Sequence, residues 1–220
     1  MNSVLDQVKH KSKLALQVVS HCHTSSGREQ YVQALKKYID ITELGSCHKT
    51  HTSINESKIS GLIEDHMFYL AFENAVCNFY VTEKFWNVKK LIVPIVLSRE
   101  PMKGLNIPRD SYIAASDFSG VKDLANYLIF LQQHPAEYLR YFEWTKKYKR
   151  TSGLNPLCEL CQWAVEKRHK VAKLNAAKWF EEDAQCVNSF VENVLFPISN
   201  MCDYDHGDGK GKIMWFRWLK

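Results

Sequence analysis

Continuous apolar runs of strand length alternate along the chain with segments whose apolar residues recur at helical spacing. Apolar runs of about four to eight residues are typical of strands buried on both faces of a sheet. The runs that predict strands cover residues 14–19, 39–44, 67–72, 91–97 and 112–115. Because helical segments lie between them, the pattern predicts an α/β fold with a doubly wound parallel sheet.

The helical segments are set by residues three and four positions apart. Tyr31, Leu35 and Tyr38 lie on one predicted helix face, and Ser119 is the expected N-cap of a helix over 123–133. Further helices are predicted over residues 59–66, 81–90 and 136–147, and one or two outside the sheet over 156–183. We therefore expect a linker at 1–13, a sheet domain at 14–150, a helical extension at 151–202 and an irregular tail at 203–220.

Composition narrows the class of protein. The 220 residues are 45% hydrophobic and 24% charged, which is typical of a globular chain and argues against a disordered one. No apolar run is long enough to span a membrane, and the polar start does not resemble a signal peptide. The net charge of +5 is too small for a dedicated nucleic-acid binder. Basic clusters at 146–150 and 167–173 leave nucleic-acid binding as an alternative, although a solvated helix face explains them better.

Chemistry is expected where the predicted strands end, because ligands of open parallel sheets bind there. The segment 24–28 contains small residues, Gly27 and Arg28 before a helix, and it could cradle a phosphate. Spacing alone favours the other interpretation, an ordinary helix cap with a solvated Arg28. Glu83 and Lys84 follow the third strand at a helix start, where they could bind hydroxyls and phosphate or form a surface ion pair.

The cysteines leave two interpretations open. Seven cysteines suit either a secretory protein with disulfides or a reduced protein with a metal site. Asn55 begins an N-glycosylation sequon, which favours the secretory interpretation. Cys22 and Cys47 follow the first two strands and could pair, whereas Cys77 has no evident partner. Two other patterns are weak metal candidates: Cys158 and Cys161 as half of a zinc site with Cys186 and Cys202 or with His169, and the acidic tail motif at 203–205. We therefore expect no metal site.

Several motifs occur together and in order. Phe72-Glu73-Asn74-Ala75 is followed by Tyr80-Val81-Thr82-Glu83-Lys84 and an aromatic segment. Further motifs lie at 19–22, 27–28, 93–97, 108–113, 123–128, 138–144 and 157–161. Together, over residues 10–165, they resemble the alpha-1,3-fucosyltransferases of glycosyltransferase family 10.

This resemblance implies the Rossmann-like, C-terminal half of a GT-B type glycosyltransferase, which binds the donor GDP-fucose. The family transfers fucose to a glycan or glycoprotein acceptor with inversion of configuration at the anomeric carbon of the sugar. Arg28 and Lys84 would neutralise the pyrophosphate, Glu83 would accept hydrogen bonds from sugar or ribose hydroxyls, and Asn74 and Tyr80 would line the donor pocket. The resemblance also favours a local disulfide between Cys158 and Cys161. No cofactor is expected, although a divalent metal could stimulate the reaction.

The resemblance has limits that are visible in the sequence. Ala75 stands where the family usually has Ser, and Phe79 where it usually has Asp. The family's general base is expected from an N-terminal domain, and its Golgi membrane anchor from a segment before that. We expect both to be missing here, so that the chain would bind donor but transfer little fucose alone. A non-catalytic nucleotide-sugar-binding module is the alternative.

Overall fold

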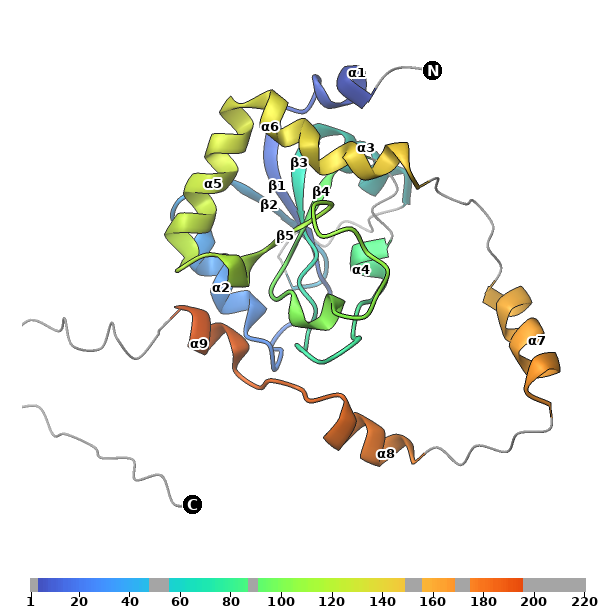
Figure 1. Cartoon of the computed structure of the whole chain (residues 1–220). Coiled ribbons are helices and arrows are strands. Elements are labelled where there is room, and N and C mark those ends of the chain that lie inside the picture. The colour runs from blue at the N-terminus through green and yellow to red at the C-terminus, as the bar shows by residue number, and fades with distance from the viewer. Residues whose placement is uncertain (1–3, 48–55, 87–90, 149–155, 169–174, 196–220) are drawn as a thin grey trace, which may run out of the picture.

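The computed structural model describes residues 4–47, 56–86, 91–148, 156–168 and 175–195. Its centre is a five-stranded sheet with the order β2-β1-β3-β4-β5, in which neighbouring strands are parallel (Figure 1). The strands are β1 (Lys13–Val18), β2 (Ile41–Leu44), β3 (His66–Leu70), β4 (Val93–Val96) and β5 (Ile113–Ala114). Each lies within or beside a predicted apolar run, so the α/β prediction is confirmed.

Helices cover both faces of the sheet (Figure 1). Successive strand residues point to opposite faces of the sheet. Ala15 of β1 packs in the layer with α2 (Arg28–Leu35) and α5 (Val121–Gln133). Leu16 packs in the opposite layer, with α3 (Glu56–Asp65) and α4 (Glu83–Trp86). The α-helices are α1 (Val4–Val8), α2 (Arg28–Leu35), α3 (Glu56–Asp65), α4 (Glu83–Trp86), α5 (Val121–Gln133), α6 (Pro135–Leu139), α7 (Pro156–Glu166), α8 (Ala176–Lys178) and α9 (Phe190–Leu195).

The ends of several helices differ from the sequence predictions. Helix α5 begins at Val121 with Gly120 as its N-cap, so the prediction of Ser119 in that role is wrong. Helix α2 ends at Leu35, which leaves Tyr38 exposed. The segment predicted as one helix over 136–147 divides into α6 and a 3₁₀ helix (Arg140–Lys146). Of the helix predicted over 81–90, α4 forms only its centre, and residues 87–90 lie outside the described residues.

The segments on either side of the sheet domain contact it. Within the part expected to be a linker, α1 buries Val8 in the core. At the other end α7 stands away from the sheet, and the chain then returns through α8 to α9, which lies beside α2 (Figure 1). None of the described helices combines the length and the apolar character that crossing a membrane requires. The boundaries of the four expected segments remain predictions.

Candidate functional site at the carboxyl ends of β1 and β3

The strand order places the candidate site between β1 and β3. From β1 the chain moves outward to β2 and then returns to β3, and this reversal makes the crevice beyond these two strands a switch point of the sheet. The loop after β1 contains 24–28, and the loop after β3 contains 73–82. Both segments singled out in the sequence therefore lie at the same edge of the sheet.

Arg28 is buried beneath the two loops and does not face solvent. The residue is only 1% exposed. Its Nη1 donates to the carbonyl of Phe72 at 2.8 Å, its Nη2 to that of His21 at 2.6 Å, and its Nε lies 3.4 Å from Glu29 Oε1. These bonds tie the β1 loop to the end of β3. The guanidinium is thus committed to the protein, and the alternative of a solvated Arg28 in an ordinary cap is wrong.

The predicted phosphate cradle at the start of α2 is covered by the C-terminal segment. Ser26 donates its backbone N–H to Asn74 and its hydroxyl to the carbonyl of Glu73. Its own carbonyl accepts from Val191 N at 3.1 Å, and Val191 itself is fully buried. Gly27 adopts φ 71°, and a Cβ there would lie 3.0 Å from Val191 Cβ. Because α9 packs so closely, this helix start is an internal junction in the structure.

The loop after β3 brings a charged cluster to the surface. Lys84 Nζ lies 3.1 Å from Glu83 Oε1, 3.3 Å from Glu73 Oε2 and 3.1 Å from Thr82 Oγ1. The Lys84 side chain is 19% exposed and that of Glu83 64% exposed. Lys84 is therefore shielded on one side and accessible on the other, which suits a cation that binds an anionic ligand.

Asn74 and Tyr80 are joined across the same loop. The Tyr80 hydroxyl donates to Asn74 Oδ1 at 2.7 Å. Between them Phe79 adopts a positive φ of 61° and is 58% exposed. The loop thus presents an aromatic side chain to solvent beside a fixed polar pair.

Burial and charge set the protonation of two groups here. Partial burial alone would raise the pKa of Glu83, but the hydrogen bond and positive charge of Lys84 lower it overall. Burial raises the pKa of Tyr69 to about 12, and the carboxylates of Glu83 and Glu73 add to the effect. Glu83 is therefore ionised and Tyr69 neutral near pH 7.

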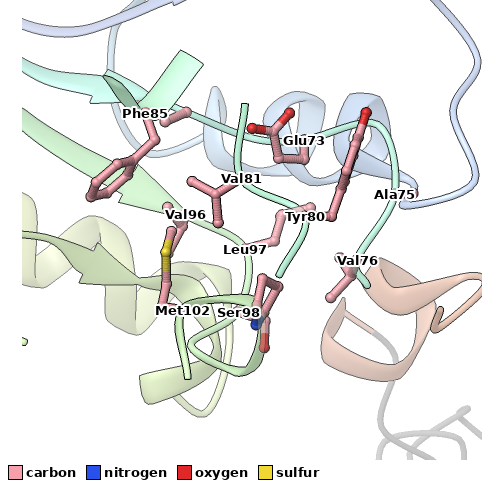
Figure 2. Close-up of a pocket in the computed structure, with 12 residues that line it drawn as sticks. Glu73, Ala75, Val76, Tyr80, Val81, Phe85, Val96, Leu97, Ser98 and Met102 are labelled. Atoms are coloured by element: carbon pink, nitrogen blue, oxygen red, sulfur yellow. The ribbon is translucent and has the colours of Figure 1, made fainter. Parts of the chain in front are cut away.

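A small, narrow pocket of about 20 Å³ lies beyond the carboxyl ends of β3 and β4, beside Glu73 and Tyr80 (Figure 2). Figure 2 shows Glu73 and Tyr80 on one side of Val81 and Leu97, with Ser98 and Met102 on the other. The remaining lining residues are Ala71, Ala75, Val76, Phe85, Val96 and Pro101. A cavity of this size has room for about one water molecule, so it is a small gap between the loops after β3 and β4.

Sequence reasoning found part of this constellation. Asn74, Tyr80, Glu83 and Lys84 share one loop and the start of α4, while Arg28 lies beneath them. It missed Glu73, which contacts Lys84, although this residue belongs to the motif that carried the resemblance. It also missed Val191, for which no local pattern gives a signal because its contacts are distant in sequence.

Disulfides connect the site loops to other parts of the chain. Cys22–Cys47 is present, which confirms that candidate pair. Cys77, which had no predicted partner, bonds to Cys186 across 109 residues and so joins the β3 loop to the C-terminal segment. Cys158 and Cys161 are free and exposed thiols on α7, so the prediction of a local bridge between them is wrong.

Metal candidates find no support in the described part of the chain. Cys186 is oxidised and cannot complete a zinc site with Cys158. Among the described residues no three His, Cys, Asp or Glu side chains are grouped as metal ligands. Asn55, His169, Cys202 and the acidic motif at 203–205 lie outside the described residues.

A parallel sheet with charged loops at its switch point defines the class of protein, a doubly wound α/β domain of the kind that binds nucleotides. The family described as glycosyltransferase family 10 (fucosyltransferase), C-terminal, matches residues 8–179, and the chain belongs to this family.

Named relatives agree with this assignment. The chain is 33% identical over 204 residues to alpha-(1,3)-fucosyltransferase fut-1 of Caenorhabditis elegans, covering 85% of this chain and 46% of the relative. It is 38% identical over 180 residues to glycoprotein 3-alpha-L-fucosyltransferase A of Drosophila melanogaster, covering 79% of this chain and 34% of the relative. The chain thus spans less than half the length of these relatives.

Solved structures share the fold. A crystal structure of an alpha1,3-fucosyltransferase superposes with a TM-score of 0.56 at 19% identity, covering 78% of this chain and 50% of that chain. Another, of an alpha1,3-fucosyltransferase with GDP-fucose, gives 0.53 at 23% identity, covering 70% and 42%. The predicted fold class, one half of a GT-B type glycosyltransferase, is confirmed.

Proposed function

We propose that this chain is the donor-binding part of an alpha-1,3-fucosyltransferase, which binds GDP-fucose for transfer of fucose to a glycan or glycoprotein acceptor. Relatives named for this activity and a fold neighbour that holds GDP-fucose support the proposal. The observation that carries it is Lys84, a partly exposed cation in the loop after β3 whose ammonium is fixed by Glu73, one of the residues that line the neighbouring pocket.

The chemistry of transfer explains why a cation is needed there. When the bond between fucose and phosphate breaks, negative charge develops on the departing GDP, and a fixed ammonium stabilises it. We assign this role to Lys84. Arg28, buried below, adds its charge to the local potential and holds the two loops together.

The remaining site residues would contact the neutral parts of the donor. Glu83 is ionised and largely exposed, so it can accept hydrogen bonds from sugar or ribose hydroxyls. Asn74 and Tyr80, already paired, would line the donor pocket. We propose no required cofactor, so that removal of divalent metal with EDTA would reduce donor binding only slightly.

The test is calorimetric titration of the purified chain with GDP-fucose and GDP, with UDP as the control nucleotide. We expect binding of both guanine nucleotides and much weaker binding of UDP. Lys84→Ala should weaken GDP binding, whereas Lys103→Ala, which removes an exposed lysine on a neighbouring loop, should not. The proposal is wrong if the folded chain binds neither guanine nucleotide at millimolar concentration.

The disulfides support a secretory location. Cys22–Cys47 and Cys77–Cys186 would persist in an oxidising compartment. We propose that the protein works in the Golgi lumen and that the complete protein is anchored in the membrane there. Fractionation of expressing cells, with non-reducing mass spectrometry of the recovered protein, would test this.

A further inference from the structure

The Glu73 carboxylate accepts three short hydrogen bonds at the candidate site, yet it plays no part in the roles assigned above. It follows β3 and its side chain is 12% exposed. The backbone N–H of Thr82 donates to Glu73 Oε1 at 2.8 Å, and Thr82 Oγ1 lies 2.7 and 2.8 Å from the two carboxylate oxygens. The carboxylate therefore closes the loop between residues 73 and 82 immediately before α4 begins.

Thr82 links Glu73 to Lys84. A hydroxyl donates one hydrogen and accepts others, so Thr82 Oγ1 donates to Glu73 while it accepts from Lys84 Nζ at 3.1 Å. Lys84 Nζ also contacts Glu73 directly at 3.3 Å. The ammonium is thus held to Glu73 by a direct ion pair and through the hydroxyl.

Two carboxylates contact Lys84, and they differ in what they can fix. The Glu83 side chain is 64% exposed, and an exposed ion pair holds a lysine only weakly. Glu73 is shielded and is itself held by Thr82. The position of the ammonium therefore depends on Glu73.

We propose that Glu73 is a positioning residue of the donor site, which holds the Lys84 ammonium in place to meet the diphosphate. This inference rests on the proposed function. Its physical basis is preorganisation: a lysine already fixed loses less conformational freedom when the ligand binds. The Glu73 carboxylate also repels the diphosphate, but its negative charge is neutralised by Lys84 and by the donors of Thr82.

The experiment is a double-mutant cycle on GDP binding with the full chain, using Glu73→Gln and Lys84→Met. Glutamine keeps an oxygen for Thr82 and removes the charge that holds Lys84. We expect Glu73→Gln to weaken GDP binding by about tenfold in the wild-type background. In the Lys84→Met background it should change binding by less than about twofold, because the residue acts through Lys84.

The controls separate positioning from folding. Glu43→Gln makes the same change at another shielded carboxylate, which pairs with Lys36. Glu43 lies on β2, on the far side of β1 from the site, so this variant should not alter GDP binding. If Glu73→Gln does not fold, Thr82→Ser and Thr82→Val test the same link. Serine should retain binding because it keeps the hydroxyl, and valine should weaken it.

Several outcomes would overturn the inference. Equal losses from Glu73→Gln in both backgrounds would show a general structural role, and tighter binding would show that repulsion prevails. In the Thr82 pair, equal binding by both variants would count against the link. If the wild type binds no GDP, the proposed function fails and this inference with it. If the wild type and Lys84→Met differ while Glu73→Gln is neutral, only the inference fails.

Discussion

Arg28 and Lys84 carry the same charge at the same edge of the sheet, but their burial separates what each can do. Arg28 is 1% exposed, and its guanidinium donates to two backbone carbonyls and pairs with Glu29. The side chain of Lys84 remains 19% exposed. A sequence motif locates both residues equally well. It does not show which of them is buried, because burial depends on α9 and on the loops around them.

Substitution of the two cations should therefore give different results. We expect Arg28→Ala to lower the free energy of unfolding by about 3 kcal/mol, because the buried carbonyl of Phe72 and the partly buried carbonyl of His21 lose their donor. Lys84→Ala should cost less than about 1 kcal/mol of stability while weakening GDP binding. Urea unfolding and calorimetry of both variants would measure this. Equal loss of stability in both would contradict the distinction.

His66 is a histidine whose protonation is changed by burial. It is fully buried at the start of β3. Its ring nitrogens lie 2.6 Å from the carbonyl of Leu62 and 2.7 Å from Thr42 Oγ1. Burial lowers the pKa of His66 despite the opposing hydrogen bond to Leu62.

This shift predicts a dependence of stability on pH. The unfolded state binds a proton at His66 more readily than the folded state, so stability is greatest above the unfolded pKa of 6.5 and falls as the pH drops below it. We expect Tm to fall more between pH 7.5 and 5.5 in the wild type than in His66→Gln. His134→Gln is a matched control, because His134 also contacts the carbonyl four residues earlier but is exposed. An unchanged slope in His66→Gln would refute the assignment.

At the scale of elements, the strands could be predicted and the ends of helices only in part. Apolar runs identify strands because burial on both faces of a sheet requires them. Helix α4 begins directly after Thr82, whose backbone N–H donates to the Glu73 carboxylate nine residues earlier. No local capping rule covers so large a separation in sequence. The junction of α2 with α9 likewise depends on Val191, which is distant from Gly27 in sequence.

The α2–α9 junction provides a test at this scale. Gly27 has φ 71°, and an added Cβ would lie 3.0 Å from Val191 Cβ. We expect Gly27→Ala to lower the free energy of unfolding by about 1–2 kcal/mol for the backbone conformation alone, with a further loss from the close contact. In a Val191→Gly background, which lacks the contacted Cβ, Gly27→Ala should lose only the part due to the backbone conformation. Gly61→Ala is the control, because open space surrounds that position.

At the scale of the whole molecule, the C-terminal segment is part of the candidate site. Residues 184–191 lie beyond the family match, which ends at 179, yet they contact both site loops. Val76 pairs with Val187 in an antiparallel bridge, and Asn78 N donates to the carbonyl of Ala184 at 2.7 Å. Strand order alone could not predict this, whereas Cys22–Cys47 could be predicted because both cysteines follow neighbouring strands.

The Cys77–Cys186 disulfide should contribute strongly to the stability of this arrangement. We expect Cys77→Ser with Cys186→Ser to lower the free energy of unfolding by about 2–5 kcal/mol, because the bridge closes a long loop. Cys158→Ser removes an exposed free thiol and should leave stability unchanged. Urea titrations without reductant would compare the two. Equal stability of the double variant and the wild type would contradict the prediction.

The contacts of residues 184–191 also set an order of events during biosynthesis. The ribosome completes all five strands, which end at Ala114, before it adds Ala184. The sheet can therefore pair while the loops after β1 and β3 still lack the segment that covers them. Val191 and Cys186 reach those loops only later, so in the nascent chain the sheet can form first and the cover over these loops last.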